Sequence, residues 1–179
     1  MGANEFPDPI QNRPEPHGVF ERILVAVDES RQAGWAIDLA TRLARVHDAR
    51  LILLHVVVLP PSRPEFAYIE PTEPGGYLRE SELMLERAKD AVPRTIQVDT
   101  VLREGDPATE ILEAAQVFGA DLIVMGTHGR GPIGRVVLGS VASAVMRKSA
   151  CPVLTVTHAP PGSDNATGAA APTATTGVA

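Results

Sequence analysis

Five short runs rich in valine, isoleucine and leucine constrain the fold of this chain more than any other feature. RILVAVD at residues 22–28 and RLILLHVVVL at residues 50–59 are continuous apolar stretches, typical of strands buried on both faces of a parallel sheet. TIQVDTVL at residues 95–102 alternates more between polar and apolar residues, which suits a strand nearer an edge. The sequence therefore predicts five strands: Arg22–Asp28, Arg50–Leu59, Thr95–Leu102, Asp121–Gly126 and Pro152–Thr157.

Segments with helical spacing of apolar residues separate these runs. Three of the predicted helices cover Ser30–His47, Tyr77–Val92 and Gly139–Lys148. Another has clear boundary signals, because Asp106 can cap it, Pro107 fits its first position and Gly119 can end it. Strands that alternate with helices imply right-handed crossovers and an open, doubly wound α/β sheet with helices on both faces.

The length and composition suit one domain. The chain has 179 residues, of which 44% are hydrophobic, enough for one sizeable core. Residues 1–19 hold four prolines, residues 159–179 are mostly small, and both segments are expected to be disordered tails around a domain at residues 20–158. Residues 59–76 carry five prolines and are expected to form a long loop that could cover a site.

Charge and residue content exclude several classes of protein. Sixteen basic and 22 acidic residues give a net charge of −6, which disfavours nonspecific binding to nucleic acid or to an anionic membrane. No apolar run approaches the roughly 20 residues of a membrane-spanning helix, and the N-terminal residues do not resemble a signal peptide, so we expect a cytoplasmic protein. Cys151 is the single cysteine, which excludes an internal disulfide, and no histidines stand at metal-ligand spacing, so we expect no protein metal site.

A glycine-rich segment follows the fourth predicted strand. It reads GTHGRGPIGRVVLGS at residues 126–140, with five glycines and no acidic residue, and it leads into the last predicted helix. Ligands of open parallel sheets bind beyond the carboxyl ends of the strands, and a helix start offers free N–H groups to anions. The segment therefore predicts a phosphate-binding site.

Two common phosphate-binding patterns do not fit this segment. The P-loop pattern GxxxxGK[ST] is absent. Gly129, Gly131 and Gly134 spell GxGxxG, but Pro132 lies inside the pattern, and no acidic residue follows about 20 positions later to hold a ribose hydroxyl. A dinucleotide-binding site is therefore disfavoured.

The spacing of Gly126, Gly129 and Gly139-Ser140 instead resembles the nucleotide-binding signature of the universal stress protein family, in its ATP-binding branch. RILVAVDES, LILLHVVV, DLIVMGTHGR and LGSVASAVMRKSACPVLTV resemble strands and the last helix of that family, over residues 20–158. The resemblance implies a Rossmann-like, adenine-nucleotide α-hydrolase-like fold with strand order 3-2-1-4-5. It also implies ATP as the ligand, with Mg²⁺ held mainly by the phosphates.

The resemblance also assigns roles to particular residues. Asp28 would contact the ribose or the adenine edge, and Gly126 and Gly129 would let the backbone approach the ribose and the α-phosphate. Ser140 and its neighbours at the start of the last helix would meet the β- and γ-phosphates. The full candidate set is Ala26, Val27, Asp28, Val56, Met125, Gly126, His128, Gly129, Arg130, Gly139, Ser140 and Val141.

Several of these residues also have purely structural interpretations. Asp28 could be a turn or cap residue, Ser140 could simply cap the last helix, and Arg130 could be ordinary surface. His55 is expected to be a core histidine with a hydrogen-bond partner, and no residue is assigned a catalytic role.

We therefore expect an ATP-binding stress protein that acts as a binding or sensor module with slow or no hydrolysis. An alternative is an adenine-nucleotide-dependent enzyme, an ATPase or nucleotidyl transferase, for which Glu29, Glu104 and Asp106 follow strands. A third hypothesis is a partner-binding protein that has lost its nucleotide. Members of the family commonly pair through the last strand, so a homodimer through residues Val153 to Val156 is expected, which would also remove an exposed apolar edge.

Overall fold

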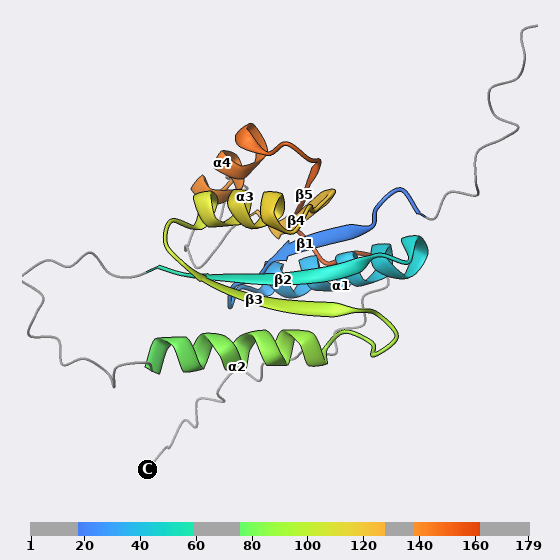
Figure 1. Ribbon diagram of the computed structural model, residues 1–179, viewed down its shortest axis with the longest axis horizontal. Helices are drawn as coiled ribbons and strands as arrows, with labels where there is room; N and C mark the ends of the chain where they lie inside the picture. Colours follow the sequence, from blue (N-terminus) through green and yellow to red (C-terminus); the bar gives the residue numbers. More distant parts are fainter. Residues whose placement is uncertain (1–17, 59–75, 128–137, 162–179) are drawn as a thin grey trace, which may run out of the picture.

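The computed structural model describes residues 18–58, 76–127 and 138–161, which form one parallel five-stranded sheet with helices on both faces (Figure 1). Most of both tails and nearly all of the proline-rich segment lie outside the described residues. In chain order the elements are β1 (Arg22–Ala26), α1 (Arg31–His47), β2 (Arg50–Val57), α2 (Gly76–Asp90), β3 (Val98–Glu104), α3 (Pro107–Val117), β4 (Leu122–Gly126), α4 (Ser140–Lys148) and β5 (Val153–Val156). The predicted fold class and the four predicted helices are thus confirmed.

The strands lie in the order β3-β2-β1-β4-β5, as expected from the family resemblance. β1 pairs in parallel with β2 on one side and with β4 on the other, so Val25 lies opposite both Leu53 and Val124. The chain therefore winds outward from β1 in one direction, through β2 and β3, and then in the other, through β4 and β5. This reversal puts the topological switch point between the carboxyl ends of β1 and β4.

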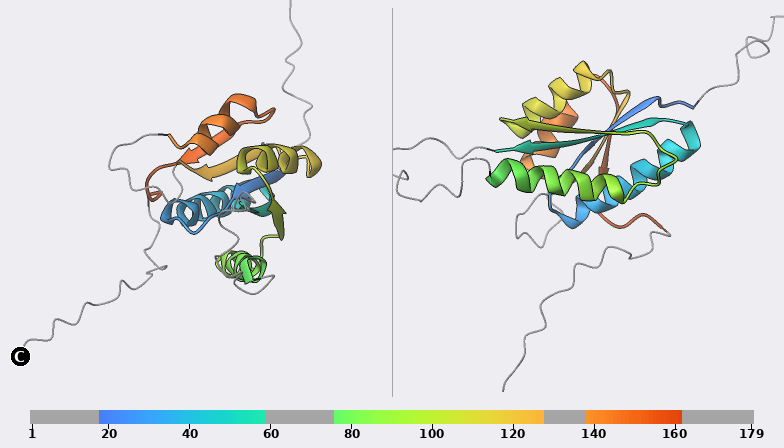
Figure 2. Two further views of the ribbon diagram at one scale, coloured as in Figure 1. Left: turned by 90° about the vertical axis from the view of Figure 1, so that its left-hand side faces the viewer. Right: turned by 60° about the horizontal axis from the view of Figure 1, so that its bottom comes forward.

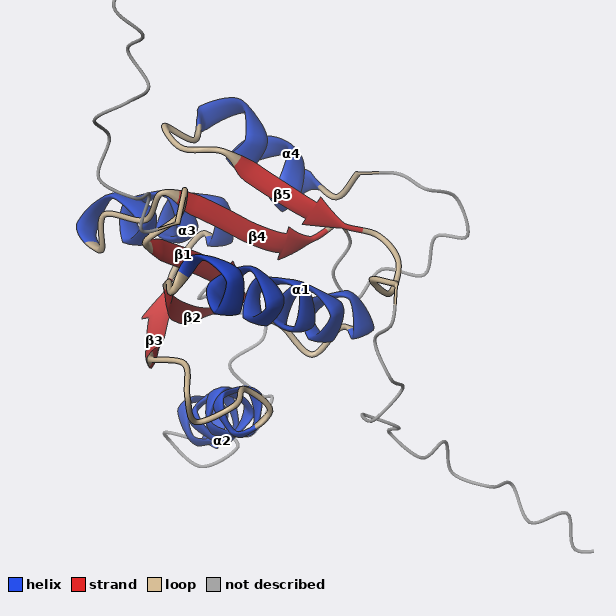
Figure 3. Cartoon of the chain, turned by 90° about the vertical axis from the view of Figure 1, so that its right-hand side faces the viewer, coloured by secondary structure: helices blue, strands red, loops and turns tan. Residues whose placement is uncertain are grey.

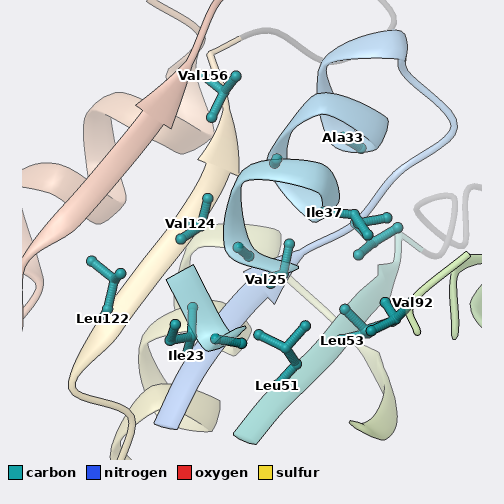
Figure 4. Packing of buried hydrophobic residues seen from close by; sticks show 14 of the residues in the cluster. Ile23, Val25, Ala33, Ile37, Leu51, Leu53, Val92, Leu122, Val124 and Val156 are labelled. Carbon is teal, nitrogen blue, oxygen red and sulfur yellow. The ribbon is translucent and has the colours of Figure 1, made fainter. Parts of the chain in front are cut away.

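The helices form a layer on each side of the sheet. α1 and α2 cover one face and α3 and α4 cover the other (Figure 2). Because successive strand residues point to opposite faces, β1 sends Ile23 and Val25 toward α1 and Leu24 toward α3 and α4. Figure 4 shows residues of the cluster under α1, with Val25, Leu51 and Leu53 on the strands and Ala33 and Ile37 on the helix.

The continuous apolar runs form the fully buried centre of the sheet. Ile23, Leu24, Leu53 and Ile123 are 0% exposed, and burying such a side chain contributes about 1.5–3 kcal/mol. β3, which was expected nearer an edge, is the edge strand beside β2, and its residues are exposed or half-buried. The hydrophobic pattern alone thus separated the central strands from this edge strand.

The predicted third strand, residues 95–102, is displaced toward the N-terminus. β3 begins at Val98 and continues to Glu104, because it pairs in register with β2 from Leu51 to Val57. Ile96 belongs instead to the preceding turn, where its N–H donates to the carbonyl of Pro93 at 3.0 Å. The sequence did not predict the end of β3 because the residues there are polar. Such residues are compatible with an edge strand, which can carry charges on its open side.

Side chains cap two of the helices, α1 and α3, but not α4. Ser30 caps α1 with its side chain, which accepts from the N–H of Ala33, and Asp106 caps α3 by accepting from the N–H of Thr109. Gly139, in extended conformation, occupies the N-cap position of α4 and offers no side chain. The alternative interpretation of Ser140 as only the cap of α4 is therefore wrong, since Ser140 is already the first helical residue.

No helix in the described part of the chain is long and apolar enough to cross a membrane.

Asp106 provides a test of the α3 cap through its charge. Hydrogen bonds from the backbone N–H and the hydroxyl of Thr109 lower the pKa of the Asp106 carboxyl below the value of 3.8 that a free aspartate has. The folded pKa is therefore the lower one, so the carboxylate stabilises the fold above pH 3.8, and this stabilisation is lost as the pH falls through the folded value. We expect the stability advantage of the wild type over Asp106→Asn to shrink in that range, measured by urea unfolding. An advantage that is constant with pH would contradict this role.

Candidate functional site

Two ends of the sheet could hold a ligand. At the amino ends of β1 and β2 lies an open cavity of about 570 Å³, lined among others by Arg22, Arg45 and Arg50. Two of these arginines already bond protein groups, since Arg50 forms an ion pair with Asp99 at 3.4 Å and Arg22 donates to the carbonyl of Gly119 at 3.0 Å. The carboxyl ends, where Figure 3 shows the arrows of β4 and β5 pointing to one edge, are the better candidate by the rule for open parallel sheets.

The carboxyl end of β1 carries a pre-positioned carboxylate. Asp28 follows β1, and its Oδ1 accepts from the N–H of Ser30 at 3.0 Å and from the Ser30 hydroxyl. Ser30 in turn caps α1, so Asp28 is a turn residue rather than the helix cap. Its second oxygen, Oδ2, makes no hydrogen bond to the described residues and can accept one from a ligand hydroxyl.

The end of β2 lies beside this turn. The N–H of Val27 donates to the carbonyl of Leu54 at 2.8 Å, which continues the β1–β2 ladder one residue beyond β1. Nδ1 of His55 lies 2.7 Å from the carbonyl oxygen of Val27. His55 is half-buried rather than buried in the core, so of the expected core histidine with a hydrogen-bond partner only the partner is confirmed. Val56 is half-buried on the opposite face, against the apolar cluster under α3 and α4.

The ends of the glycine-rich segment are held together at their base. Thr127 follows β4, and its carbonyl accepts from the N–H of Gly139 at 2.8 Å, while its own N–H donates to the carbonyl of Val156 at 3.1 Å. Thr127 therefore joins three elements: β4, β5 and the start of α4. It is 5% exposed, so this junction lies in the protein interior. Sequence reasoning missed this residue, because a threonine inside a glycine-rich segment carries no pattern that indicates a clamp.

The start of α4 is electrostatically suited to an anion. Gly139 makes no side-chain cap, and the first turn of α4 contains no acidic residue, so the positive end of the helix is neither capped nor neutralised by its own side chains. The basic residues of α4, Arg147 and Lys148, lie in its last turn, at the other end. α1 and α3 differ in this respect, since Ser30 and Asp106 already satisfy N–H groups there.

Most of the candidate set lies at this edge. Ala26, Val27 and Asp28 end β1, Met125 and Gly126 end β4, and Gly139 is tied to Thr127 at the start of α4. Met125 is buried and faces the cluster under α3 and α4. His128, Gly129 and Arg130 lie outside the described residues. Among the described residues, no group of three or more histidine, cysteine, aspartate or glutamate side chains could hold a metal ion.

Gly126 has a packing role that the sequence did not indicate. A Cβ atom at this position would lie 2.8 Å from Cβ of Gln32 in the first turn of α1. This distance is shorter than side chains tolerate, so glycine is required here for the close approach of β4 to α1, with or without a ligand.

The fold and the site together define a class of protein: a doubly wound α/β domain with an uncapped helix start at its switch point. Residues 20–157 match the sequence profile of the Universal stress protein family, and the chain belongs to that family. A universal stress protein of Bacillus subtilis is 35% identical over 151 residues, covering 77% of this chain and 99% of the relative. One from Thermus aquaticus is 37% identical over 139 residues, covering 77% and 99%.

Solved structures agree with this assignment. A universal stress protein family member from Burkholderia pseudomallei is 31% identical with a TM-score of 0.60, covering 81% of this chain and 100% of that one. A universal stress protein in complex with cAMP is 30% identical with a TM-score of 0.53, covering 77% and 97%. One from Archaeoglobus fulgidus in complex with dAMP is 22% identical with a TM-score of 0.55, covering 77% and 98%, and shares the fold. Structural homologues of this chain thus bind adenine nucleotides.

The packing role of Gly126 can be tested with a matched pair of glycine-to-alanine variants. Gly126→Ala forces a Cβ against Gln32 and should destabilise the protein by about 1–3 kcal/mol. Gly34→Ala adds a methyl group in open space within α1 and should stabilise it by roughly 0.5–1 kcal/mol. Urea unfolding of both variants measures the two changes, and equal effects would contradict the contact.

Proposed function

We propose that this chain binds an adenine nucleotide, ATP in the first place, at the carboxyl edge between β1 and β4, and acts as a nucleotide-dependent binding or sensor module. The observation that carries the proposal is the start of α4, which is tied to Thr127 beside the switch point and lacks both a side-chain cap and an acidic first turn. Phosphate groups are natural partners for such a helix start. Further support comes from the relative that was solved with cAMP.

In this proposal the β1 side of the switch point contacts the ribose and the base, and the start of α4 contacts the phosphates. Asp28 on the β1 side accepts hydrogen bonds from ribose hydroxyls through Oδ2, since Oδ1 is engaged by Ser30. The backbone of Ala26 and Val27 and the side chain of Val56 border the base. On the other side, the N–H groups of Ser140 and Val141 and the Ser140 hydroxyl contact the phosphates.

A phosphate chain longer than that of a monophosphate is favoured by local charge. Residues 126–140, which lead to the start of α4, hold two basic residues, Arg130 and Arg135, and no acidic one, in a chain whose net charge is −6. We assign Mg²⁺ to the phosphates themselves, because the proposal needs no protein metal ligand.

Hydrolysis is proposed to be slow or absent. Of the acidic residues that follow strands, Asp106 is engaged in capping α3 through Thr109. Glu104 ends β3, which is separated from β1 by β2. Phosphoryl transfer to water needs a group that orients the water at the terminal phosphate, and neither of these two residues is free and adjacent to the switch point. Glu29, the third candidate, follows Asp28 at the switch point and already has an interaction of its own.

A variant at Gly139 separates binding from folding. Its backbone is extended, so aspartate fits without strain, and the new carboxylate can cap α4 while it repels phosphate. We expect Gly139→Asp to keep the thermal stability of the wild type and to weaken ATP binding on the order of tenfold or more, by isothermal titration calorimetry. Gln116→Glu, an exposed change in α3 that alters the net charge equally, is the control and should bind like the wild type.

The same titration with ADP, AMP and cAMP ranks the nucleotides. Mass spectrometry of whatever the wild type releases on denaturation, after purification without added nucleotide, tests turnover, since recovered ATP indicates slow hydrolysis. Unchanged ATP affinity in Gly139→Asp would refute the assignment of the phosphates to the start of α4. A wild type that binds none of the four nucleotides would refute the proposed function.

We also propose a homodimer through antiparallel pairing of β5. Ile123 N–H donates to the Pro152 carbonyl and Thr127 N–H to the Val156 carbonyl, so the intervening Val153 and Thr155 turn their backbone groups away from β4. β5 ends the sheet, and its Leu154 is 36% exposed. An unpaired apolar edge invites association, and pairing with a second copy satisfies it.

Thr155→Pro tests this pairing. It removes an N–H that points away from β4, a position where an edge strand accepts proline, so the monomer should keep its fold. We expect the wild type to sediment as a dimer at micromolar concentration and Thr155→Pro as a monomer with an unchanged circular dichroism spectrum. A monomeric wild type would refute the dimer.

A further inference from the structure

His55 is a half-buried titratable residue to which no role in the site has been given. It lies in β2, opposite Leu102 of β3, and its ring reaches the backbone just beyond β1. Its Nδ1 is 2.7 Å from the carbonyl oxygen of Val27, the residue that immediately precedes Asp28. The imidazole therefore contacts the backbone at the point where β1 ends and the candidate site begins.

The chemistry of the contact determines the state of the ring. A carbonyl oxygen only accepts hydrogen bonds, so Nδ1 must carry the proton and donate. The neutral ring is therefore held in its Nδ1–H form, with Nε2 unprotonated. This form can be detected directly, because the two ring nitrogens differ strongly in their NMR signals when only one of them is protonated.

The contact replaces part of the sheet ladder. The register of β1 with β2 ends at Ala26 and Leu54, and one further ladder bond follows, from Val27 N–H to the Leu54 carbonyl. The next acceptor along β1, the Val27 carbonyl, is held by the His55 side chain. The direction of this carbonyl sets the plane of the Val27–Asp28 peptide, since the peptide group is rigid.

We propose that His55 is a positioning residue of the nucleotide site, which orients the Val27–Asp28 peptide so that Asp28 faces the ligand. Asp28 is then fixed at two points: its backbone by the ring of His55 and its carboxylate by Ser30. Holding both in advance lowers the entropy that binding must remove. The inference rests on the proposed function, because it concerns the same site.

The test uses three substitutions of His55 that differ in where they can donate. Asparagine places an N–H donor near the position of Nδ1, glutamine places it about where Nε2 lies, and leucine has none. We expect His55→Leu to weaken ATP binding on the order of tenfold, the loss of one buried hydrogen bond, and His55→Asn to restore most of it. His55→Gln should bind as weakly as His55→Leu.

A control separates positioning from stability. Val98→Ala removes a half-buried side chain at the start of β3, far along the strand from the site, and should lower stability with unchanged ATP affinity. In the wild type, two-bond ¹H–¹⁵N correlation spectra should show the Nδ1–H form of His55 at a pH where the ring is neutral.

The outcomes are distinct. Equal ATP affinity of His55→Leu and wild type, equal recovery by asparagine and glutamine, or the Nε2–H form of the ring would each overturn the role of His55 and leave the proposed function intact. A wild type that does not bind ATP, ADP, AMP or cAMP would overturn both.

Discussion

The structure depends on the double pairing of β1. This strand lies between β2 and β4, and its side chains Ile23, Leu24 and Val25 are fully buried. Because every strand is parallel to it, all the carboxyl ends meet at one edge, and the chain must leave that edge toward opposite faces from β1 and from β4. The loop that carries Asp28 and the segment that begins at Gly126 are adjacent only because of this pairing, although they are far apart in the sequence.

The three described helix starts at which a cap is defined differ in whether a side chain caps them. α1 and α3 satisfy N–H groups with Ser30 and Asp106, which makes their positions independent of any ligand. α4 starts with Gly139, and glycine at an N-cap is less stabilising than serine by only a few tenths of a kcal/mol. The backbone bond from Gly139 to Thr127 and the burial of Ala142 and Val145 hold α4 in place, so no side-chain cap is needed to position it.

Two residues at the proposed site make contacts within the protein that the nucleotide-binding pattern does not indicate. Gly126 has a place in the nucleotide-binding pattern of the family, yet the contact that excludes a side chain is with Gln32 of α1. His55 belongs to a buried strand, yet its ring holds the Val27 carbonyl at the edge where a ligand would bind. In both cases the requirement is a short distance between two backbone segments, which residue type alone does not reveal.

Much of the architecture could be predicted from the sequence. Continuous apolar runs identified the central strands, Asp106 and Pro107 marked the start of α3, and the glycine pattern indicated the family, because these signals are local and depend on side-chain periodicity or backbone preference. The ends of β3 could not be predicted, since they depend on the register with β2.

The clamp at Thr127, the packing of Gly126 on Gln32 and the hold of His55 on Val27 were also decided by the tertiary structure. Each is a contact between segments that the sequence does not bring together. The sequence by itself thus determined which elements form and which family they belong to. Only the tertiary structure decided how those elements meet at the carboxyl edge, because distances between segments are set by the pairing and packing of the whole sheet.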